Sequence, residues 1–321
     1  MALDNNNTYT GGTIISAGTL QLGTAVDTNA LTSPLGGGPV TINSSSILNI
    51  ASSKGVTVTN VIADDGTGTV VVSSGANKFT AANTYTGDTV VRGGTLALTG
   101  TGAINNSALI IVSNGTFDVS ASSAAVASAG ALVLTNGTFS LGTNLVTSLG
   151  TLAVSNSTLT LAANTNTPAI SLTGALVTGG VTNLINVTAM PALPSYPTNI
   201  TLIKYTTADS GVTNANNSLT SLGVTLPGVG YLTNNIGNSS IDLVVVSGVN
   251  TNAATANFRA TAAAGSLQFS WAPDHLGWQL YTNAVSLTAS GSWFPVPGSS
   301  SVTNLIISIN PAMTNVFFQL R

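Results

Sequence analysis

The sequence has no cysteine, no glutamate and a single histidine, and these absences remove most of the chemistry that enzymes use. Without cysteine there is no thiol nucleophile and no thiolate metal site, and without glutamate paired-glutamate glycoside hydrolysis is excluded. Charged residues make up 5% of the 321 positions, whereas a typical soluble domain has about 25%. The inventory therefore indicates a structural protein, and we expect no enzyme activity, no metal site and no cofactor.

Basic charge and long apolar runs are also scarce. Six Lys and Arg stand against nine Asp, for a formal net charge of −3 and a pI near 4.6. Such a chain offers no basic patch to nucleic acid or anionic lipid, and no run approaches the roughly 18 apolar residues of a membrane span. The first basic residue is Lys54, so the opening lacks the charged region of a secretory signal. We expect no nucleic-acid partner and no membrane insertion, and if the protein is exported, a signal outside this numbering.

Apolar side chains, by contrast, are plentiful. The chain is 43% hydrophobic with a mean hydropathy of +0.42, which separates it from disordered chains of low charge and small polar residues. At roughly 150 residues per domain, the length allows one elongated unit plus a small appendage. A folded chain with an apolar core and an almost uncharged polar surface is predicted.

Internal repeats are visible at once. The segment from Asn7 to Leu22 (NTYTGGTIISAGTLQL) returns 76 positions later from Asn83 to Leu98 (NTYTGDTVVRGGTLAL). A shorter signature also recurs, a small residue followed by Thr, an apolar residue, any residue and a second apolar residue. Including two weaker copies, the signature occurs seven times. Its second residue is residue 19, 47, 69, 95, 116, 138 or 158, and successive copies are 28, 22, 26, 21, 22 and 20 residues apart.

Within each copy the apolar residues alternate, which is the pattern of a strand with one face buried. A period near 22 residues fits one coil of a β-solenoid, with three short strands and three corners, stacked at about 4.8 Å per coil. Asn114, Asn136 and Asn156 would then occupy one corner in three consecutive coils, as an asparagine ladder or a stacked left-handed turn. The alternative is that each Asn-Gly pair makes a hairpin turn.

The later chain changes character twice. Three Pro between Met190 and Pro197 cannot donate to a strand ladder, so we expect irregular terminal coils over 190–248 within a shaft that spans 1–248. After a linker at 249–257, residues 258–321 hold all three Trp and five of the eight Phe. This segment is predicted to form a compact antiparallel β-sandwich of five or six strands.

The unit at 7–22 resembles the autotransporter-associated β-strand repeat, also called the passenger-associated transport repeat. Its second copy departs at Asp88 and Arg92, both expected to be exposed. The resemblance implies a right-handed parallel β-helix in a secreted bacterial protein, with a structural or adhesive role. Residues 228–246 look like the end of a passenger in the same kind of chain. Residues 272–278 and 310–318 are similar to a C-terminal module of secreted repeat proteins.

Three groups of residues could carry chemistry, and each has a simpler structural interpretation. Asp64-Asp65-Gly66 could open a calcium loop or a lyase site with Lys54 or Lys78 as base, but a solvated corner is the preferred interpretation. Asp274-His275 lacks a recognisable nucleophile and is interpreted as a turn. The three Trp could stack on sugars, although Trp271 closes an alternating apolar face and is expected in the core.

The feature that most directly suggests a function is the open end of a solenoid, because its last coil exposes unpaired backbone groups and part of the apolar core. Residues 1–6 contain no obvious cap, so we expect head-to-tail growth of copies into an extracellular filament. The alternatives are a surface adhesin that binds glycans, a carbohydrate-active enzyme, or a fragment whose upstream coils are missing. The residues predicted to mediate assembly are Ala2, Leu3, Tyr9, Val316, Phe317, Phe318 and Leu320.

Overall fold

The computed structural model describes residues 1–124, 130–191, 193, 195, 197–208, 222–247, 256–263, 265–272, 275, 278–310 and 315–321. The chain divides into two compact units. The solenoid unit comprises Met1–Pro191, Ile200–Thr225 and Leu232–Leu243, and the C-terminal unit comprises Ala192–Asn199, Leu226–Tyr231 and Val244–Arg321. The predicted fold class is confirmed, because the described chain consists of strands, with a parallel solenoid followed by small antiparallel sheets.

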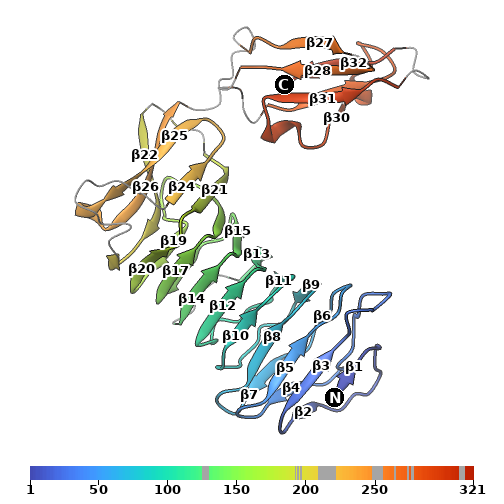
Figure 1. The fold of residues 1–321 in the computed structure, drawn as a ribbon, viewed down its shortest axis with the longest axis vertical. Helices are drawn as coiled ribbons and strands as arrows, with labels where there is room; N and C mark the ends of the chain where they lie inside the picture. The colour runs from blue at the N-terminus through green and yellow to red at the C-terminus, as the bar shows by residue number, and fades with distance from the viewer. Residues whose placement is uncertain are drawn as a thin grey trace. The chain divides into compact units, whose positions relative to one another are not determined.

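One long face of the solenoid is a ten-stranded sheet (Figure 1), and every pairing in it is parallel. Each strand pairs with the strand one coil later, so the chain winds about one axis. In spatial order the sheet contains β1 (Ala2–Leu3), β3 (Thr19–Leu22), β5 (Ile47–Ile50), β8 (Thr69–Val72), β10 (Thr89–Val91), β12 (Leu109–Ser113), β14 (Ala131–Thr135), β17 (Thr151–Ser155), β20 (Ala175–Gly179) and β23 (Thr207–Ala208).

A second, eight-stranded face is likewise parallel. It contains β6 (Thr57–Val58), β9 (Ala76–Phe79), β11 (Thr95–Gly100), β13 (Thr116–Ser122), β15 (Thr138–Gly142), β18 (Thr158–Ala162), β21 (Asn183–Ala189) and β24 (Leu222–Thr225).

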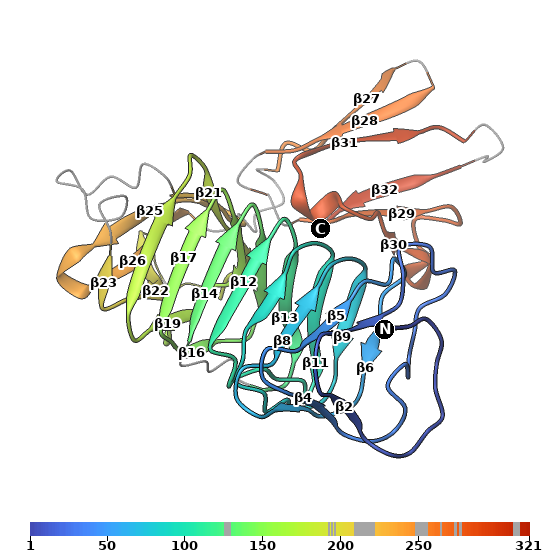
Figure 2. The same ribbon diagram turned by 60° about the horizontal axis from the view of Figure 1, so that its bottom comes forward.

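Shorter sheets complete the coils (Figure 2). The first is the parallel sheet of β2 (Thr13–Ile15), β4 (Val40–Ile42) and β7 (Ile62–Asp64). The second has the order β16 (Val146–Leu149), β19 (Ile170–Leu172), β22 (Thr198–Lys204), β26 (Ser240–Ser247) and β25 (Val229–Asn235).

The interior of the solenoid is built by strand alternation. In β12, Ile110 and Val112 are buried while their neighbours are half-buried, and the same alternation recurs in β14, β15, β17 and β18 and over the first residues of β13. Identical positions of successive coils therefore stack on one another. Phe117 and Phe139 are in register on β13 and β15, and their rings lie parallel, 5.4 Å apart and inclined by 9°. Such a stack adds to the free energy gained by burial alone.

The corner between the two long sheets uses left-handed backbone in six consecutive coils. The residues there are Gly75, Gly94, Asn114, Asn136, Asn156 and Gly180, with φ between 49° and 77°. Asn tolerates this region better than other residues with a Cβ. The backbone N–H of Asn114 donates to the carbonyl of Thr135, and that of Asn136 donates to Ser155. The three asparagines therefore stand at stacked left-handed corners, whereas a side-chain ladder between them remains a prediction.

The strand signature does not mark a single face of the solenoid. Positions 19, 47 and 69 pair in register on the ten-stranded sheet, whereas positions 95, 116, 138 and 158 pair on the eight-stranded sheet. Between them, Thr95 pairs with Ala76 rather than with Thr69. The two long repeats are displaced in the same way, because β2 of the first copy and β10 of the second lie in different sheets. Alternation encodes a half-buried strand and is the same on every face of a coil.

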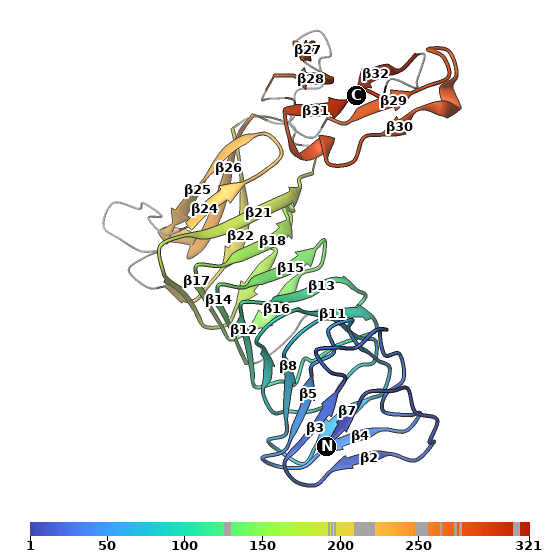
Figure 3. The same ribbon diagram turned by 45° about the vertical axis from the view of Figure 1, so that its right-hand side comes forward.

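The C-terminal unit contains two three-stranded antiparallel sheets (Figure 3), which agrees with the predicted strand number. Phe269, Trp271 and Leu280 form their common core, with Phe318 and Leu320 packed against it. One sheet has the order β27 (Arg259–Ala263), β28 (Ser266–Ser270) and β31 (Asn304–Ser308). The other has the order β30 (Phe294–Pro295), β29 (Leu280–Asn283) and β32 (Phe317–Leu320).

The remaining structure is sparse. Three short 3₁₀ turns lie between strands in the described part of the chain: η1 (Ile236–Asn238), η4 (Ser290–Ser292) and η5 (Ser299–Ser301). None of the helices in the described part of the chain has the length and apolarity that crossing a membrane requires. Most of the expected linker at 249–257 lies outside the described residues, so the boundary between shaft and C-terminal domain remains a prediction.

Candidate assembly edge on the first coil

The second copy of the long repeat shows how its first residue works. Asn83 is buried, and its Oδ1 accepts a hydrogen bond of 2.9 Å from the backbone N–H of Ile62 in the preceding coil. Its Nδ2 donates to the carbonyls of Ala81 and Ala103 at 3.0 and 3.1 Å, and its own N–H also donates to Ala103. One side chain therefore joins three coils by hydrogen bonds.

The tyrosine two residues later is sealed inside the same copy. The Tyr85 hydroxyl lies 2.7 Å from the Oγ1 of Thr89, which lies 3.0 Å from the Oγ of Ser107 in the next coil. All three residues are buried, and Tyr85 has no exposed surface. Burial raises the pKa of the Tyr85 phenol, and the negative charge of Asp64 raises it further.

The preceding coil also accepts hydrogen bonds from backbone N–H groups of this copy. The N–H groups of Thr86 and Gly87 donate to the Oδ2 of Asp64 at 2.9 and 2.8 Å, and the Thr86 hydroxyl donates to the same carboxylate. Contact is so close that a Cβ on Gly87 would overlap the carbonyl oxygen of Gly68. The segment from 62 to 68 thus lies directly against the second repeat.

The first copy has the same local structure. Asn7 donates from its N–H to Ser33 and from its Nδ2 to the carbonyl of Pro34 at 2.7 Å. The Tyr9 hydroxyl lies 2.8 Å from the Oγ1 of Thr13, four residues on, as in the second copy. The motif therefore repeats the contact between tyrosine and threonine, and in both copies the asparagine donates to the coil that follows.

The two copies also differ on the side of the preceding coil. Tyr9 is 40% exposed, whereas Tyr85 is fully buried. Within the described part of the chain, no residue accepts a hydrogen bond from the N–H groups of residues 8–11, although the equivalent groups at 84–87 are all bonded to Ile62 or Asp64. A Cβ on Gly11 would meet no atom within 4 Å. We name residues 7–13, with the adjoining β1, the open edge.

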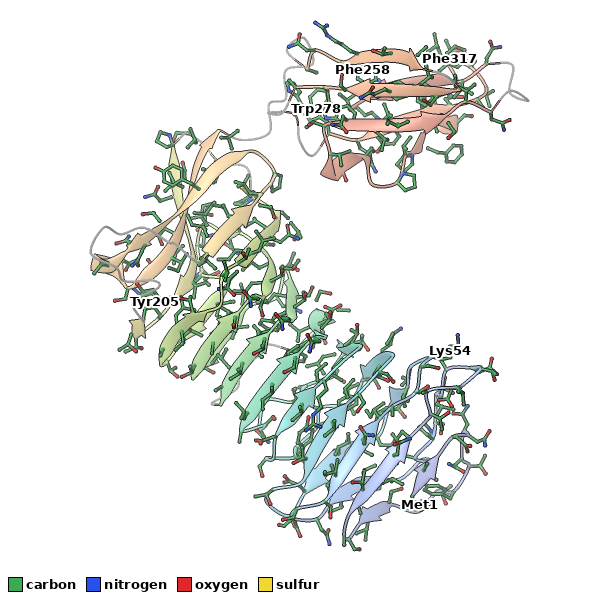
Figure 4. All side chains as sticks on the ribbon, viewed as in Figure 1. Met1, Lys54, Tyr205, Phe258, Trp278 and Phe317 are labelled. Atoms are coloured by element: carbon green, nitrogen blue, oxygen red, sulfur yellow. The ribbon has the colours of Figure 1, made fainter. Side chains whose placement is uncertain are left out.

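The open edge is concave. A cavity of about 470 Å³ lies beside it, lined mainly by apolar groups of the first coil. Met1 lies at this end of the solenoid unit (Figure 4). The lining residues are Met1, Leu3, Tyr9, Gly12, Thr13, Ile14, Ile15, Ser16, Ala17, Thr19 and Leu20. An apolar hollow bordered by free N–H groups is the shape that another coil would fill.

The residues predicted to mediate assembly fall into two places. Ala2 and Leu3 form β1 and pair with Gln21 and Leu22 of β3, so the opening residues supply a strand to the first coil, beside Tyr9. The residues of the second place, Val316, Phe317, Phe318 and Leu320, lie in or next to β32 of the C-terminal unit. Phe318 and Leu320 pack into the core of that unit, and the Phe318 ring lies 4.6 Å from the ring of Phe269.

The residues considered for chemistry have structural contacts. The Asp64 carboxylate is saturated by Thr86 and Gly87, and Asp65 accepts a hydrogen bond from Ser44 at 2.8 Å. The described residues contain no group of three His or Asp side chains that could hold a metal ion. The Asp64-Asp65-Gly66 corner is therefore a structural bridge between coils in this fold.

The other pair and the tryptophans belong to the C-terminal unit. Asp274 lies outside the described residues, while His275 is buried with its ring 4.8 Å from the ring of Trp278. Trp271 is buried in the core, as its place in an alternating apolar strand predicts. Trp278 and Trp293 are half-buried.

Sequence reasoning missed the part that Asn83 and Asp64 play. The repeated NTYTG string contained the signal, since a buried asparagine and a glycine at fixed offsets mark a turn held by neighbouring coils. Asp64 lies outside either copy of the repeat and gave no such signal.

Comparison with known proteins agrees with this geometry. The family model named passenger-associated-transport-repeat matches residues 1–22 and 64–98. These two segments contain the open edge and its covered counterpart, together with Asp64. No curated protein and no solved structure matches the chain significantly. The matched repeats and the parallel solenoid fit an autotransporter-associated β-helix repeat protein, similar in kind to the passengers of autotransporters.

Proposed function

We propose that the protein is an extracellular structural component whose molecules assemble head to tail into a filament. The passenger-type repeat supports a secreted or surface location and a structural or adhesive role. The near absence of charge and of clustered catalytic or metal-binding groups in the described residues supports the same class.

The observation that carries the proposal is the difference between Tyr9 and Tyr85. The same motif is open in one copy and sealed by a preceding coil in the other, so the second copy is a template for how the first can be covered. A strand placed on residues 8–11 as residues 62–64 lie on 84–87 would satisfy four N–H groups and bury the Tyr9 ring. Both are favourable, because backbone pairing and apolar burial are gained together.

Growth of this kind has a direction. All described pairings on the two long faces are parallel, and the opposite ends of these sheets are formed by β23 and β24. The two ends of the solenoid unit therefore carry different strands, and a contact between them is heterologous. Heterologous contacts that do not close into a ring produce open filaments.

Gly11→Ala tests the proposal without disturbing the fold. A Cβ at Gly11 meets nothing in the monomer, whereas the equivalent Cβ at Gly87 would strike the backbone of the covering coil. The variant should keep the wild-type melting temperature and lose filaments in negative-stain electron microscopy. Gly37→Ala is the matched control, because a Cβ there also meets nothing and residue 37 lies outside the open edge.

Dispersed wild-type monomers at high concentration would contradict the proposal, as would filaments of Gly11→Ala equal to those of the wild type. Binding on a glycan array by such monomers would favour an adhesin instead.

A further inference from the structure

The outer surface of the ten-stranded sheet carries an aliphatic row. In β10, β12, β14 and β17 two inward side chains are buried and the residue between them points outward, and in β20 the residue after the buried Leu176 does so. These outward residues are in register from strand to strand. The aliphatic row consists of Val90, Ile111, Val133, Ala153 and Val177.

The row is partly open to solvent. Val177 is 39% exposed, and the four others are half-buried because each lies between two neighbours. Val71 continues the row at its start but is only 7% exposed. The strands that carry the row lie side by side as one continuous surface (Figure 1).

This composition is specific to one face. The equivalent outward row on the eight-stranded sheet is in register from β9 to β21 and is mostly polar. Its members are Lys78, Ala97, Asp118, Ser140, Thr160 and Asn186. Outward positions of this fold can therefore hold polar residues. Because the outward row of the ten-stranded sheet is aliphatic instead, we interpret it as an interaction surface.

Two opposite charges flank the row. Asp88 and Arg92 lie two residues before and after Val90, so strand alternation directs all three outward. Four residues of extended chain separate the two by about 13 Å, and neither forms an ion pair with a described residue. The first repeat has Gly12 and Ser16 at these two positions, so both charges are additions to the motif.

We propose that the aliphatic row is a contact between two copies of this chain, packed face to face with Asp88 of each copy opposite Arg92 of the other. Such a contact has a two-fold axis that runs along the row. The strands of the two copies then run in opposite directions, while the coils of both copies stack in the same direction. This axis brings every row residue opposite its own counterpart and sets Asp88 of each copy opposite Arg92 of the other. A two-fold axis along the strands would instead place Asp88 on the same side of the contact as Asp88 of the partner copy.

The contact is small. Five strands at about 4.8 Å and four residues of width give about 300 Å² on each copy, below the roughly 800 Å² per partner of a standard stable interface. The expected association is weak and reversible, and it does not depend on the filament. It is therefore measured in the Gly11→Ala background, where failure of end-to-end growth cannot be confused with failure of the lateral contact.

Charge reversal gives the first test. Sedimentation velocity over a concentration series should show that Asp88→Arg alone and Arg92→Asp alone each weaken dimerisation at least tenfold. The double reversal should restore it to within about threefold, because opposite charges then meet again. Lys78→Glu, which changes the net charge as Arg92→Asp does but lies on the other sheet, should leave dimerisation unchanged.

Cross-linking gives the geometry. The chain has no cysteine, so Val90→Cys, Val133→Cys and Val177→Cys each introduce a single thiol. With a short bis-maleimide, all three variants should form covalent dimers, because each residue faces itself along the axis. Cross-linking at only one of the three positions would overturn the arrangement. Single charge reversals without effect would also overturn it, as would a wild-type row that binds insoluble polysaccharide while the protein remains monomeric.

Discussion

The hydroxyl of Tyr85 lies 2.7 Å from the Oγ1 of Thr89, inside a solenoid coil where neither side chain reaches solvent. The pair Tyr9 and Thr13 repeats this contact at 2.8 Å with the tyrosine 40% exposed. The motif thus determines the local turn, and stacking determines the burial. A preceding coil supplies an acceptor for each backbone N–H of residues 84–87, and the N–H groups of residues 8–11 have no acceptor in the described structure.

Tyr85→Phe should change how stability depends on pH. The phenol pKa is raised by burial in the folded state, so between pH 10 and the folded-state pKa only the unfolded chain ionises, at its ordinary pKa of about 10. Stability is fully present below pH 10 and falls above it, by about 1.4 kcal/mol per pH unit for this group. Chemical denaturation from pH 8 to 11.5 should show a shallower fall for the variant. Parallel profiles for the two proteins would refute this assignment.

Asn83→Ala should cost far more stability than Asn7→Ala. Asn83 makes three side-chain hydrogen bonds and is buried, and each such bond contributes about 1 kcal/mol. We expect a loss of about 2 to 3 kcal/mol for Asn83→Ala and about 1 kcal/mol or less for Asn7→Ala, measured by urea unfolding of monomeric protein. Equal losses would mean that the coil preceding Asn83 contributes little.

Asn136→Gly and Asn136→Ala should have different effects on the stability of the fold. The residue has a φ of 50°, where glycine is unstrained and alanine costs about 1 kcal/mol or more. The glycine variant should melt within about 2 °C of the wild type, and the alanine variant should melt lower. If alanine proved as stable as glycine, the corner would not require left-handed backbone.

Phe139→Ala should be among the most damaging substitutions in the shaft. It removes a fully buried ring that stacks on Phe117 in the preceding coil, and large-to-small core changes of this kind cost about 3 to 5 kcal/mol. Phe139→Leu fills most of the space and should cost about 1 to 2 kcal/mol. Thermal unfolding by circular dichroism measures both, and a loss under 1 kcal/mol for alanine would contradict the packing described.

Much of this architecture could be predicted from periodicity. The alternation in Gly94–Leu98 and in Gly137–Leu141 predicts strands with one buried face, and the structure places β11 and β15 there. The spacing near 22 residues predicts stacked coils. The aromatic-rich chain after residue 258 predicts the separate antiparallel sheets.

Other features could not be read from the residues. Thr69 and Thr95 carry the same signature on different faces, because every face of a coil needs the same inward alternation. In β12 the run Leu109-Ile-Ile-Val112 is apolar at every position, so no pattern says which side chains face outward. The outward row emerges only when the registers of five strands are known.

The contrast between the two repeat copies is likewise invisible in the sequence. Asn7-Thr-Tyr-Thr-Gly and Asn83-Thr-Tyr-Thr-Gly are identical strings. Their difference arises from the segment 62–68, which lies against one of them and has no counterpart in contact with the other among the described residues.

Hydrogen–deuterium exchange of the full chain, measured across a concentration series, tests the central claim most directly. Amides 84–87 are bonded to the preceding coil and should be protected at every concentration, whereas amides 8–11 should exchange rapidly in dilute solution and become protected as molecules join. Amides 8–11 that exchange at the unprotected rate in concentrated protein would show that nothing docks on the open edge.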